Sequence, residues 1–123
     1  MSTILLSIKP EYSNRIFNGT KKYEFRKRLA KKNVDKIIVY SSSPEQRIIG
    51  EVEVIGTLSL KPSPLWEITK KEAGISRSKF REYFKGCKNA YAYKLGEAKK
   101  YDNPKTLTEF GIKLPPQSFI YID

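Results

Sequence analysis

A strand of unusual length restricts the fold of this chain more than any other feature. Residues 48–60 read IIGEVEVIGTLSL, in which apolar and polar side chains alternate with the period of a half-buried β-strand. The strand that we predict from Arg47 to Leu60 contains Gly50 and Gly56, and glycines inside a strand mark bulges or bends. A long strand with two such bends can curl and help to close a small barrel, so we expect a curved sheet.

The rest of the chain alternates shorter strands with a few helices. Further strands are predicted at residues 3–8, 22–26, 36–40, 89–95 and 115–122. Helices are predicted at residues 10–17, 62–73 and 76–85, with one or two helical turns at 104–110. These helices are too few to cover a parallel sheet, and no linker or repeat divides the chain. We therefore expect one domain over residues 1–123, of the α+β class, built on a small, mixed, partly closed β-barrel of five to six strands flanked by helices.

Positive charge is concentrated in two blocks of the sequence. The chain has 24 lysines and arginines against 13 acidic residues, a formal net charge of +11. Residues 1–36 carry ten basic and three acidic side chains, and residues 61–100 carry eleven and four. A fold that brings the two blocks together would present one positive face, which favours RNA or a nucleotide-like ligand as partner. Scattered lysines that only aid solubility are the competing interpretation.

The chain has no histidine and only one cysteine, Cys87, and both facts narrow the possible chemistry. They leave no internal disulfide, too few soft ligands for a zinc or iron–sulfur site, and no histidine-dependent nucleophile. We predict no metal and no cofactor, except that a nuclease activity could use a divalent cation. No stretch has the pattern of a signal peptide or the length of a membrane span, so we expect a cytoplasmic protein without a membrane partner.

A group of charged residues follows the first predicted helix. Gly19 allows the chain to reverse, and Lys21 then stands at the start of the next strand. Glu24 and Arg26 are two residues apart, so their side chains project from the same side of that strand, ~6–7 Å from one another. Such a pair can accept a hydrogen bond from a base amino group while Arg26 and Lys21 contact phosphate or carbonyl oxygens. An ion pair that only orders the strand is the alternative.

The residues Gly19, Lys21, Glu24 and Arg26 resemble the GxKxxExR signature of the ASCH family, which belongs to the PUA-like superfold. The segments ILLSIKPEYSNRIFNGTKKYEFRKR, YSSSP, IIGEVEV and PPQSFIY are also similar to bacterial ASCH proteins. The resemblance therefore covers nearly the whole chain. It implies a barrel of five to six strands with a cleft whose floor carries the charged residues of the motif.

The resemblance also implies two kinds of function for this cleft. Family members are generally thought to bind RNA or nucleotide-like ligands, and this is the function that we expect first. Some small relatives look like hydrolases, either ribonucleases or amidohydrolases of acylated nucleosides; Lys21 and Glu24 would then be the catalytic residues. Those amidohydrolases have a threonine at the position of Glu24, and this chain lacks that hydroxyl group. A third possibility is a protein-interaction domain that docks through the helical pair at residues 62–85.

Other residues are expected around the same cleft. Lysines near the motif can contact phosphates, aromatic rings can stack a base, and polar residues at strand ends can line the mouth of a barrel. Strand alternation places one more carboxylate nearby. On these grounds the predicted ligand-binding residues, besides Lys21, Glu24 and Arg26, are Lys9, Lys22, Tyr40, Ser41, Glu51, Gln117 and Ser118. Turn hydrogen bonds, core packing and solvated charge are the competing roles of these residues.

Overall fold

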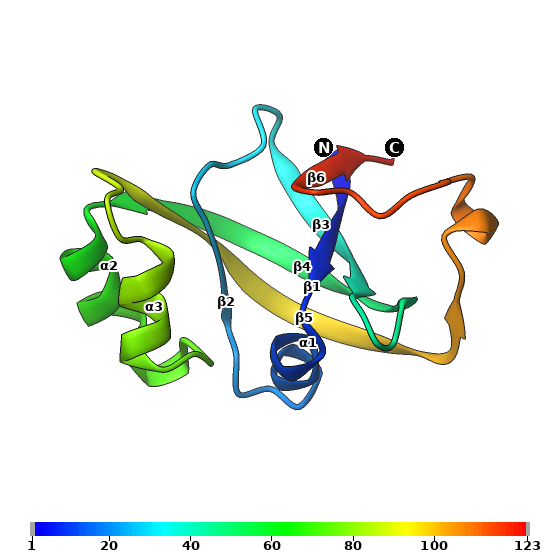
Figure 1. Cartoon of the computed structure of the whole chain (residues 1–123), viewed down its shortest axis with the longest axis horizontal. Helices are drawn as coiled ribbons and strands as arrows, with labels where there is room; N and C mark the ends of the chain where they lie inside the picture. The colour runs from blue at the N-terminus through cyan, green and yellow to red at the C-terminus, as the bar shows by residue number, and fades with distance from the viewer. Residues whose placement is uncertain (1, 123) are drawn as a thin grey trace.

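One six-stranded sheet organises the chain, and the computed structural model describes it for residues 2–122 (Figure 1). The strands lie in the order β2-β5-β4-β3-β1-β6. They are β1 (Ser2–Ile8), β2 (Tyr23–Arg26), β3 (Val34–Ser41), β4 (Arg47–Leu60), β5 (Ala90–Lys105) and β6 (Phe119–Tyr121). The helices are α1 (Pro10–Phe17), α2 (Pro62–Thr69) and α3 (Arg77–Tyr83), with the 3-10 turns η1 (Lys70–Glu72) and η2 (Thr108–Phe110). Because β1 and β3 pair in parallel and the other neighbours pair antiparallel, the sheet is mixed, as predicted.

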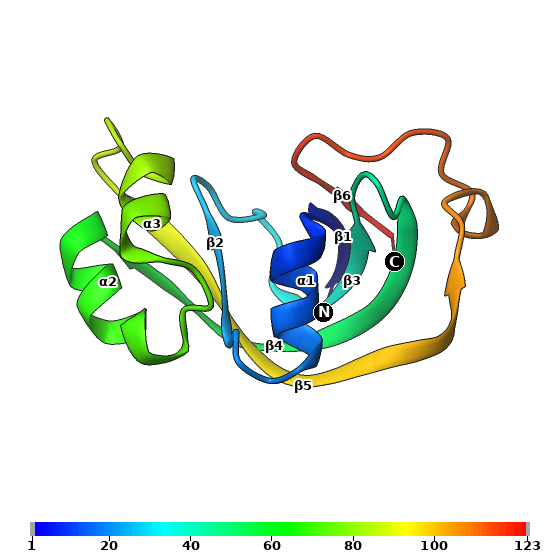
Figure 2. The ribbon, with the colours of Figure 1, turned by 60° about the horizontal axis from the view of Figure 1, so that its bottom comes forward.

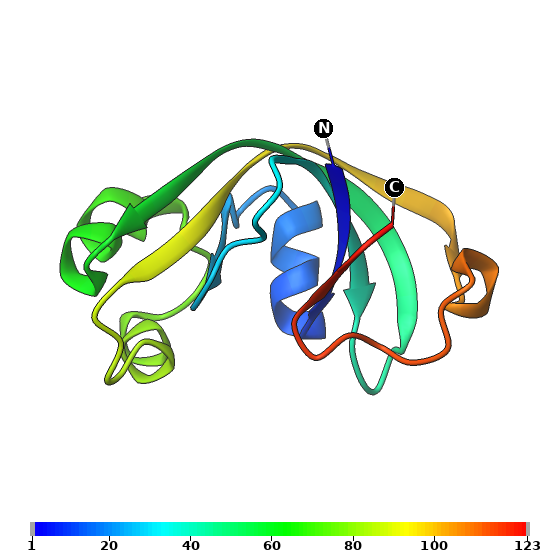
Figure 3. The same ribbon diagram turned by 90° about the horizontal axis from the view of Figure 1, so that it is seen from above.

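The two longest strands, β4 and β5, curl the sheet into a half-barrel that arches over α1 (Figure 3). Their pairing shifts register near Gly50 and Gly56, which confirms the two irregularities predicted from the glycines. A Cβ atom on Gly50 would lie 2.7 Å from ring atoms of Phe17. Only a glycine therefore allows β4 to pass so close to α1.

Both α2 and α3 belong to the connection between β4 and β5. The last residue of β4, Leu60, pairs with the first residue of β5, Ala90. Residues 61–89, which we call the helical lobe, therefore leave the sheet and return to the same place. The lobe lies at one end of the molecule, and β2 lies between it and α1 (Figure 2).

Separate clusters of buried side chains hold α1 and the helical lobe to the sheet. The cluster beneath α1 is mainly aliphatic and includes Ile4, Leu6, Ile16, Ile37, Val39, Val52 and Tyr93. The cluster beneath the lobe is rich in aromatic rings and includes Tyr23, Phe25, Leu65, Phe80, Phe84 and Ala92. A third, smaller cluster contains Leu5, Ile38, Tyr40 and Ile48. Helix α1 and the helical lobe, which flank β2, thus pack on different clusters.

The end of β5 differs from the prediction, because the strand continues to Lys105 instead of ending at residue 95. The polar run after Leu95 has no regular alternation, but β4 pairs with it as far as Lys105. The pairing of β2 with β5 stops at Lys94, so Pro104 lies on an edge where its missing N–H group is tolerated. The helical turns predicted at 104–110 are accordingly reduced to η2, and the final strand is reduced to β6.

The remaining helices lie where they are predicted but are shorter. The helix predicted at 62–73 consists of α2 followed by η1, and the helix predicted at 76–85 is α3. Among the helices of residues 2–122, none is long and apolar enough to cross a membrane.

Candidate functional site

The motif segment is fixed between the end of α1 and the helical lobe. Gly19 has a φ of +86°, a left-handed conformation that reverses the chain after α1. The N–H group of Lys21 donates to the carbonyl oxygen of Arg15 at 3.0 Å. The next N–H group, of Lys22, donates to the carbonyl oxygen of Glu72 at 2.8 Å. The backbone at Lys21 and Lys22 is therefore held by α1 on one side and by the helical lobe on the other, just before β2 begins.

The side chain of Lys21 is buried although it carries a charge, since 3% of the residue is exposed. Its Nζ donates a hydrogen bond to the carbonyl oxygen of Ala73 at 2.8 Å. The same nitrogen lies over the rings of Phe25 and Tyr12, 5.0 and 5.4 Å from their centroids, and such contacts stabilise a cation. Burial nevertheless lowers the pKa of Lys21, and the nearby Glu24 carboxylate opposes this decrease.

The lowered pKa of Lys21 predicts how stability depends on pH. Lys21 releases its proton at a lower pH when folded than when unfolded, so the unfolded state binds more protons as the pH approaches the ordinary lysine pKa of 10.5. The free energy of unfolding of the wild type should therefore rise, relative to that of Lys21→Met, from neutral pH to pH 10.5. Urea unfolding of both proteins across this range measures the difference, in which the shared contributions of the tyrosines cancel. A difference that is independent of pH would contradict the prediction.

On β2, Glu24 and Arg26 form an ion pair beside Lys21. The Nη2 and Nε atoms of Arg26 lie 2.9 and 3.1 Å from Oε2 of Glu24. Nη2 also donates to the carbonyl oxygen of Ser7, on β1, at 3.0 Å. Because the side chains of Glu24 and Arg26 are only 9% and 18% exposed, this pair is better oriented and less screened than a surface ion pair.

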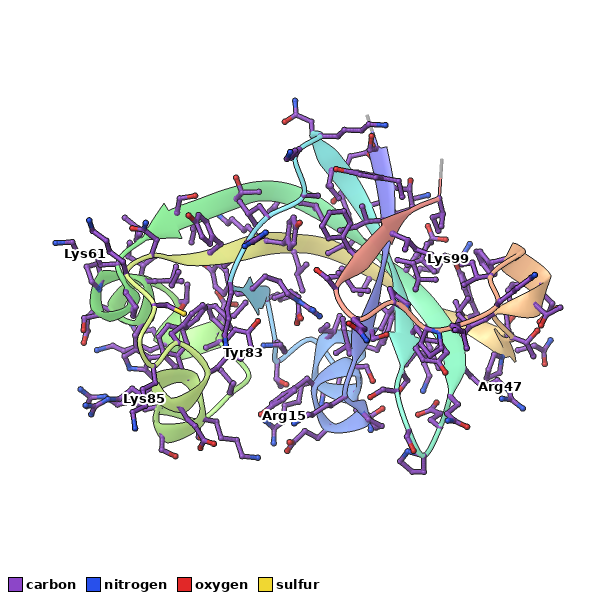
Figure 4. All side chains as sticks on the ribbon, turned by 45° about the horizontal axis from the view of Figure 1, so that its top comes forward. Arg15, Arg47, Lys61, Tyr83, Lys85 and Lys99 are labelled. Atoms are coloured by element: carbon purple, nitrogen blue, oxygen red, sulfur yellow. The ribbon has the colours of Figure 1, made fainter. Side chains whose placement is uncertain are left out.

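The motif residues line a cleft of about 470 Å³ between α1 and α3. Figure 4 shows Tyr83 on the side of α3 near β2, and Arg15 beside α1. Five cationic and two acidic side chains line the cleft, and its volume is in the range of small-ligand sites. The lining residues are Ser7, Ile8, Lys9, Tyr12, Lys21, Glu24, Phe25, Arg26, Lys27, Ile75, Lys79, Glu82 and Tyr83.

Four of the predicted ligand-binding residues lie together in this cleft: Lys9, Lys21, Glu24 and Arg26. Lys22 does not line it: residues 21 and 22 precede β2 and do not follow the alternation of that strand, and the side chain of Lys21 is the one that enters the cleft.

At the end of β3, Tyr40 and Ser41 are buried away from the cleft. Tyr40 is 4% exposed and packs in the third cluster with Leu5, while Ser41 is fully buried. The hydroxyl of Ser41 is 3.1 Å from that of Ser13 and donates to Oε2 of Glu45 at 3.1 Å. The structure therefore places these two residues in the core and in a turn, and not at a ligand site.

The expected second carboxylate, Glu51, also lies elsewhere. It forms an ion pair with Lys36 at 3.0 Å and accepts a hydrogen bond from the hydroxyl of Tyr101 at 2.9 Å. These partners come from the strands on either side of β4, so Glu51 bridges three strands instead of joining Glu24.

The residues Gln117 and Ser118 are exposed in the segment before β6 and do not line the cleft. Their neighbour Pro116 accepts a hydrogen bond from the hydroxyl of Ser7 at 3.0 Å. Since Ser7 lines the cleft, this segment passes beside it without contributing the two predicted side chains.

The sequence does not predict that α3 lines the cleft. At intervals of three and four residues, Phe80, Tyr83 and Phe84 share one side of a helix, which predicts a common apolar face, and Phe80 and Phe84 are indeed buried. Tyr83 is instead 37% exposed, and Nζ of Lys27 lies 5.1 Å from the centroid of its ring. Its place at the margin of the apolar face, where a ring can reach solvent, was the available signal. In the part of the chain that the structure describes, no three His, Cys, Asp or Glu side chains are grouped to hold a metal ion.

Together the fold and the cleft define a small α+β half-barrel domain with a basic cleft between its helices. Residues 6–105 match the ASCH domain. The chain therefore belongs to the ASCH domain family, as its GxKxxExR motif predicts.

Several known proteins are similar to nearly the whole of this chain, but the match covers very different fractions of those proteins. The crystal structure of ASCH from Zymomonas mobilis superposes with a TM-score of 0.90 and 26% identity, covering 98% of this chain and 87% of that one. An ASCH domain-containing ribonuclease from Zymomonas mobilis is 28% identical over 122 residues, which cover 96% of this chain and 82% of that protein. A protein named ATP synthase subunit alpha from Ureaplasma parvum is 31% identical over 121 residues, but the chain spans only 15% of its length.

Proposed function

We propose that this protein binds RNA, with one nucleotide in the cleft over Lys21, Glu24 and Arg26. The observation that carries the proposal is the oriented Glu24–Arg26 pair beside a buried lysine, in a cleft with an excess of cations. A cleft lined by one sign of charge concentrates ligands of the opposite sign. The name of the Zymomonas mobilis relative, an ASCH domain-containing ribonuclease, supports RNA as the ligand class.

Each wall of the cleft suits a different part of a nucleotide. Arg26 offers a planar donor group, and the exposed Lys27 offers a mobile one, for phosphate oxygens. The carboxylate of Glu24 can accept a hydrogen bond from the amino group of a base. The partly exposed ring of Tyr83 provides a face on which a base can stack, a contact worth about 1–3 kcal/mol.

Cleavage of RNA is the second function that the site supports. The specific observation is a buried lysine that lines the cleft and whose pKa is lowered by burial, since both favour a lysine that can accept a proton from a ligand. The neutral amine of Lys21 would take the proton of a 2′-hydroxyl group as that oxygen attacks the adjacent phosphorus. The 5′-oxygen would leave with a proton from water, the hydroxide so formed would take the proton from Lys21, and Arg26 would face the charge on the phosphoryl oxygens.

A comparison of Lys21→Met with Lys22→Met tests the binding proposal. The two variants remove the same charge from adjacent residues, of which only Lys21 lines the cleft. We expect the affinity for single-stranded RNA to fall about 10- to 100-fold in Lys21→Met, as for the loss of one hydrogen bond to a charged group. In Lys22→Met the loss should stay within about threefold. Fluorescence anisotropy with a labelled RNA at fixed salt measures both affinities.

Circular dichroism serves as the control that both variants are folded. Equal affinities of the wild type and Lys21→Met would contradict RNA binding through this cleft. The same proteins are then incubated with short RNAs and with acylated nucleosides, with and without Mg²⁺ or Mn²⁺. Turnover that disappears in Lys21→Met supports the hydrolase function, whereas turnover that persists in this variant excludes Lys21 as the base.

A further inference from the structure

Helix α3 separates two hollows of the protein surface, and cations border both. Lys79 and Tyr83 line the cleft described above, whereas Arg77 and Arg81 line a second hollow of about 170 Å³. The residues around this second hollow are Pro62, Ser63, Trp66, Glu67, Arg77, Phe80 and Arg81. Phe80 is buried and the two arginines are exposed, so the hollow has an aromatic floor and a cationic rim.

Helical spacing places the cations of the second hollow in a row. Arg77 and Arg81 are four residues apart, so they lie on one side of α3, and Lys85 follows four residues later in the turn after the helix. We call these three exposed residues the α3 stripe. Lys79 and Tyr83 lie on another side of the helix, toward the cleft, and Lys85 points outward from the lobe (Figure 4).

Little negative charge offsets the α3 stripe. No carboxylate of residues 2–122 forms an ion pair with Arg77, Arg81 or Lys85. Glu67 borders the second hollow and attracts Arg77 electrostatically, but its Oε2 is held by Nζ of Lys70 at 2.7 Å. Like charges one turn apart on a helix disfavour the helix. An anionic ligand along the stripe would relieve this repulsion.

We infer that the α3 stripe binds the phosphates of a single RNA strand whose unpaired nucleotide occupies the cleft. This inference rests on the proposed function, which it deepens by naming the ligand as an oligonucleotide and not a free nucleotide. The cleft and the second hollow lie on two sides of one helix, which is ~10 Å across with its side chains. A strand that leaves the cleft over α3 therefore reaches Arg81 and Arg77 after a few nucleotides.

The test is the double variant Arg77→Gln/Arg81→Gln, with Lys99→Gln/Lys100→Gln as matched control. The control removes the same charge from exposed residues of β5, and Figure 4 shows Lys99 far from the helical lobe. Binding is measured by titration with oligouridylate and oligoadenylate of about eight nucleotides, and with the corresponding 5′-mononucleotides. Each measurement is made at several salt concentrations.

We expect the double arginine variant to bind the oligonucleotides at least about tenfold more weakly at low salt, with unchanged affinity for the mononucleotides. The slope of log affinity against log salt should become shallower by about 1.4, since each phosphate contact to a single strand contributes ~0.7. The lysine control should keep the wild-type slope. These results would support the inference.

Two results would overturn the inference while leaving the proposed function in place. One is a wild type that binds oligonucleotides no more tightly than mononucleotides. The other is an equal loss of oligonucleotide affinity in the arginine variant and the lysine control, which would indicate an effect of net charge alone. A wild type that binds neither kind of ligand would instead overturn the proposed function, and this inference with it.

Discussion

Replacement of Phe80 by alanine is expected to lower the free energy of unfolding by about 3–5 kcal/mol, the usual cost of removing a buried phenylalanine side chain. Phe80 is 1% exposed and occupies the centre of the aromatic cluster beneath the helical lobe. The centroid of its ring lies 5.0 Å from that of Phe25, 4.9 Å from that of Phe84 and 5.1 Å from that of Trp66. Alanine would leave a cavity among these three rings.

The matched control for this variant is Ile68→Ala, in the same lobe. Ile68 is 58% exposed, so its truncation should change stability by no more than about 0.5 kcal/mol. Because Phe25 both contacts Phe80 and lines the cleft, we also expect Phe80→Ala to weaken RNA binding. Urea unfolding and anisotropy measure the two effects. Similar stabilities of the two variants would show that the lobe is not anchored through Phe80.

Substitution of Gly74 by alanine is expected to destabilise the protein by about 2–4 kcal/mol, from backbone strain together with overpacking. Gly74 has a φ of +65°, and a Cβ atom on it would collide with the Cβ and Cγ atoms of Lys21. The carbonyl oxygen of Gly74 also accepts a hydrogen bond from Nη1 of Arg15 at 3.0 Å. The substitution should therefore displace Lys21 and reduce RNA affinity as well as stability.

A second glycine, Gly86, separates the two causes of this effect. Gly86 has a φ of +81° but open space around its Cβ position, so Gly86→Ala carries only the conformational cost of about 1–2 kcal/mol. The excess loss in Gly74→Ala then measures the collision with Lys21. Equal losses of stability, with unchanged RNA affinity in both variants, would mean that Gly74 does not position Lys21.

Local sequence patterns predict most of the sheet and the centre of the site. Alternation in β4 places Val52 and Val54 in the core, where the structure has them. Lys21, Glu24 and Arg26 could be grouped from the sequence because they lie within six residues of one another. The backbone geometry of a strand is enough to put Glu24 and Arg26 on one side, whereas Lys21 precedes β2 and is grouped with them by the motif.

Residues whose surroundings depend on distant segments could not be predicted in this way. Alternation assigns Glu51 to a face of β4, but its partners Lys36 and Tyr101 follow from the pairing of β4 with β3 and β5. Tyr83 reaches the cleft only because the helical lobe packs against β2. The local pattern of apolar and polar residues identifies neither the partners of Glu51 nor the packing of the helical lobe against β2.

The two basic blocks of the sequence meet at the cleft only in part. Lys9 and Lys27 of the first block line it together with Lys79 of the second. Arg77 and Arg81, also of the second block, lie around the other hollow. The charge therefore forms two adjoining basic areas, one on each side of α3, where composition alone suggested one positive face.

Because Leu60 pairs with Ala90, residues 61–89 form an insertion that leaves the sheet and returns to it at one point. A different segment could replace them and still leave the same hairpin, provided that its underside covered the rings of Tyr23 and Phe25. Such an exchange would build a new wall opposite α1 while the glutamate and arginine of the floor stayed in place, and Lys21 would keep its position only if the new segment supplied a carbonyl oxygen in the place of that of Ala73. Ligand choice in this architecture can thus diverge by replacement of one insertion, without any rebuilding of the strands beneath it.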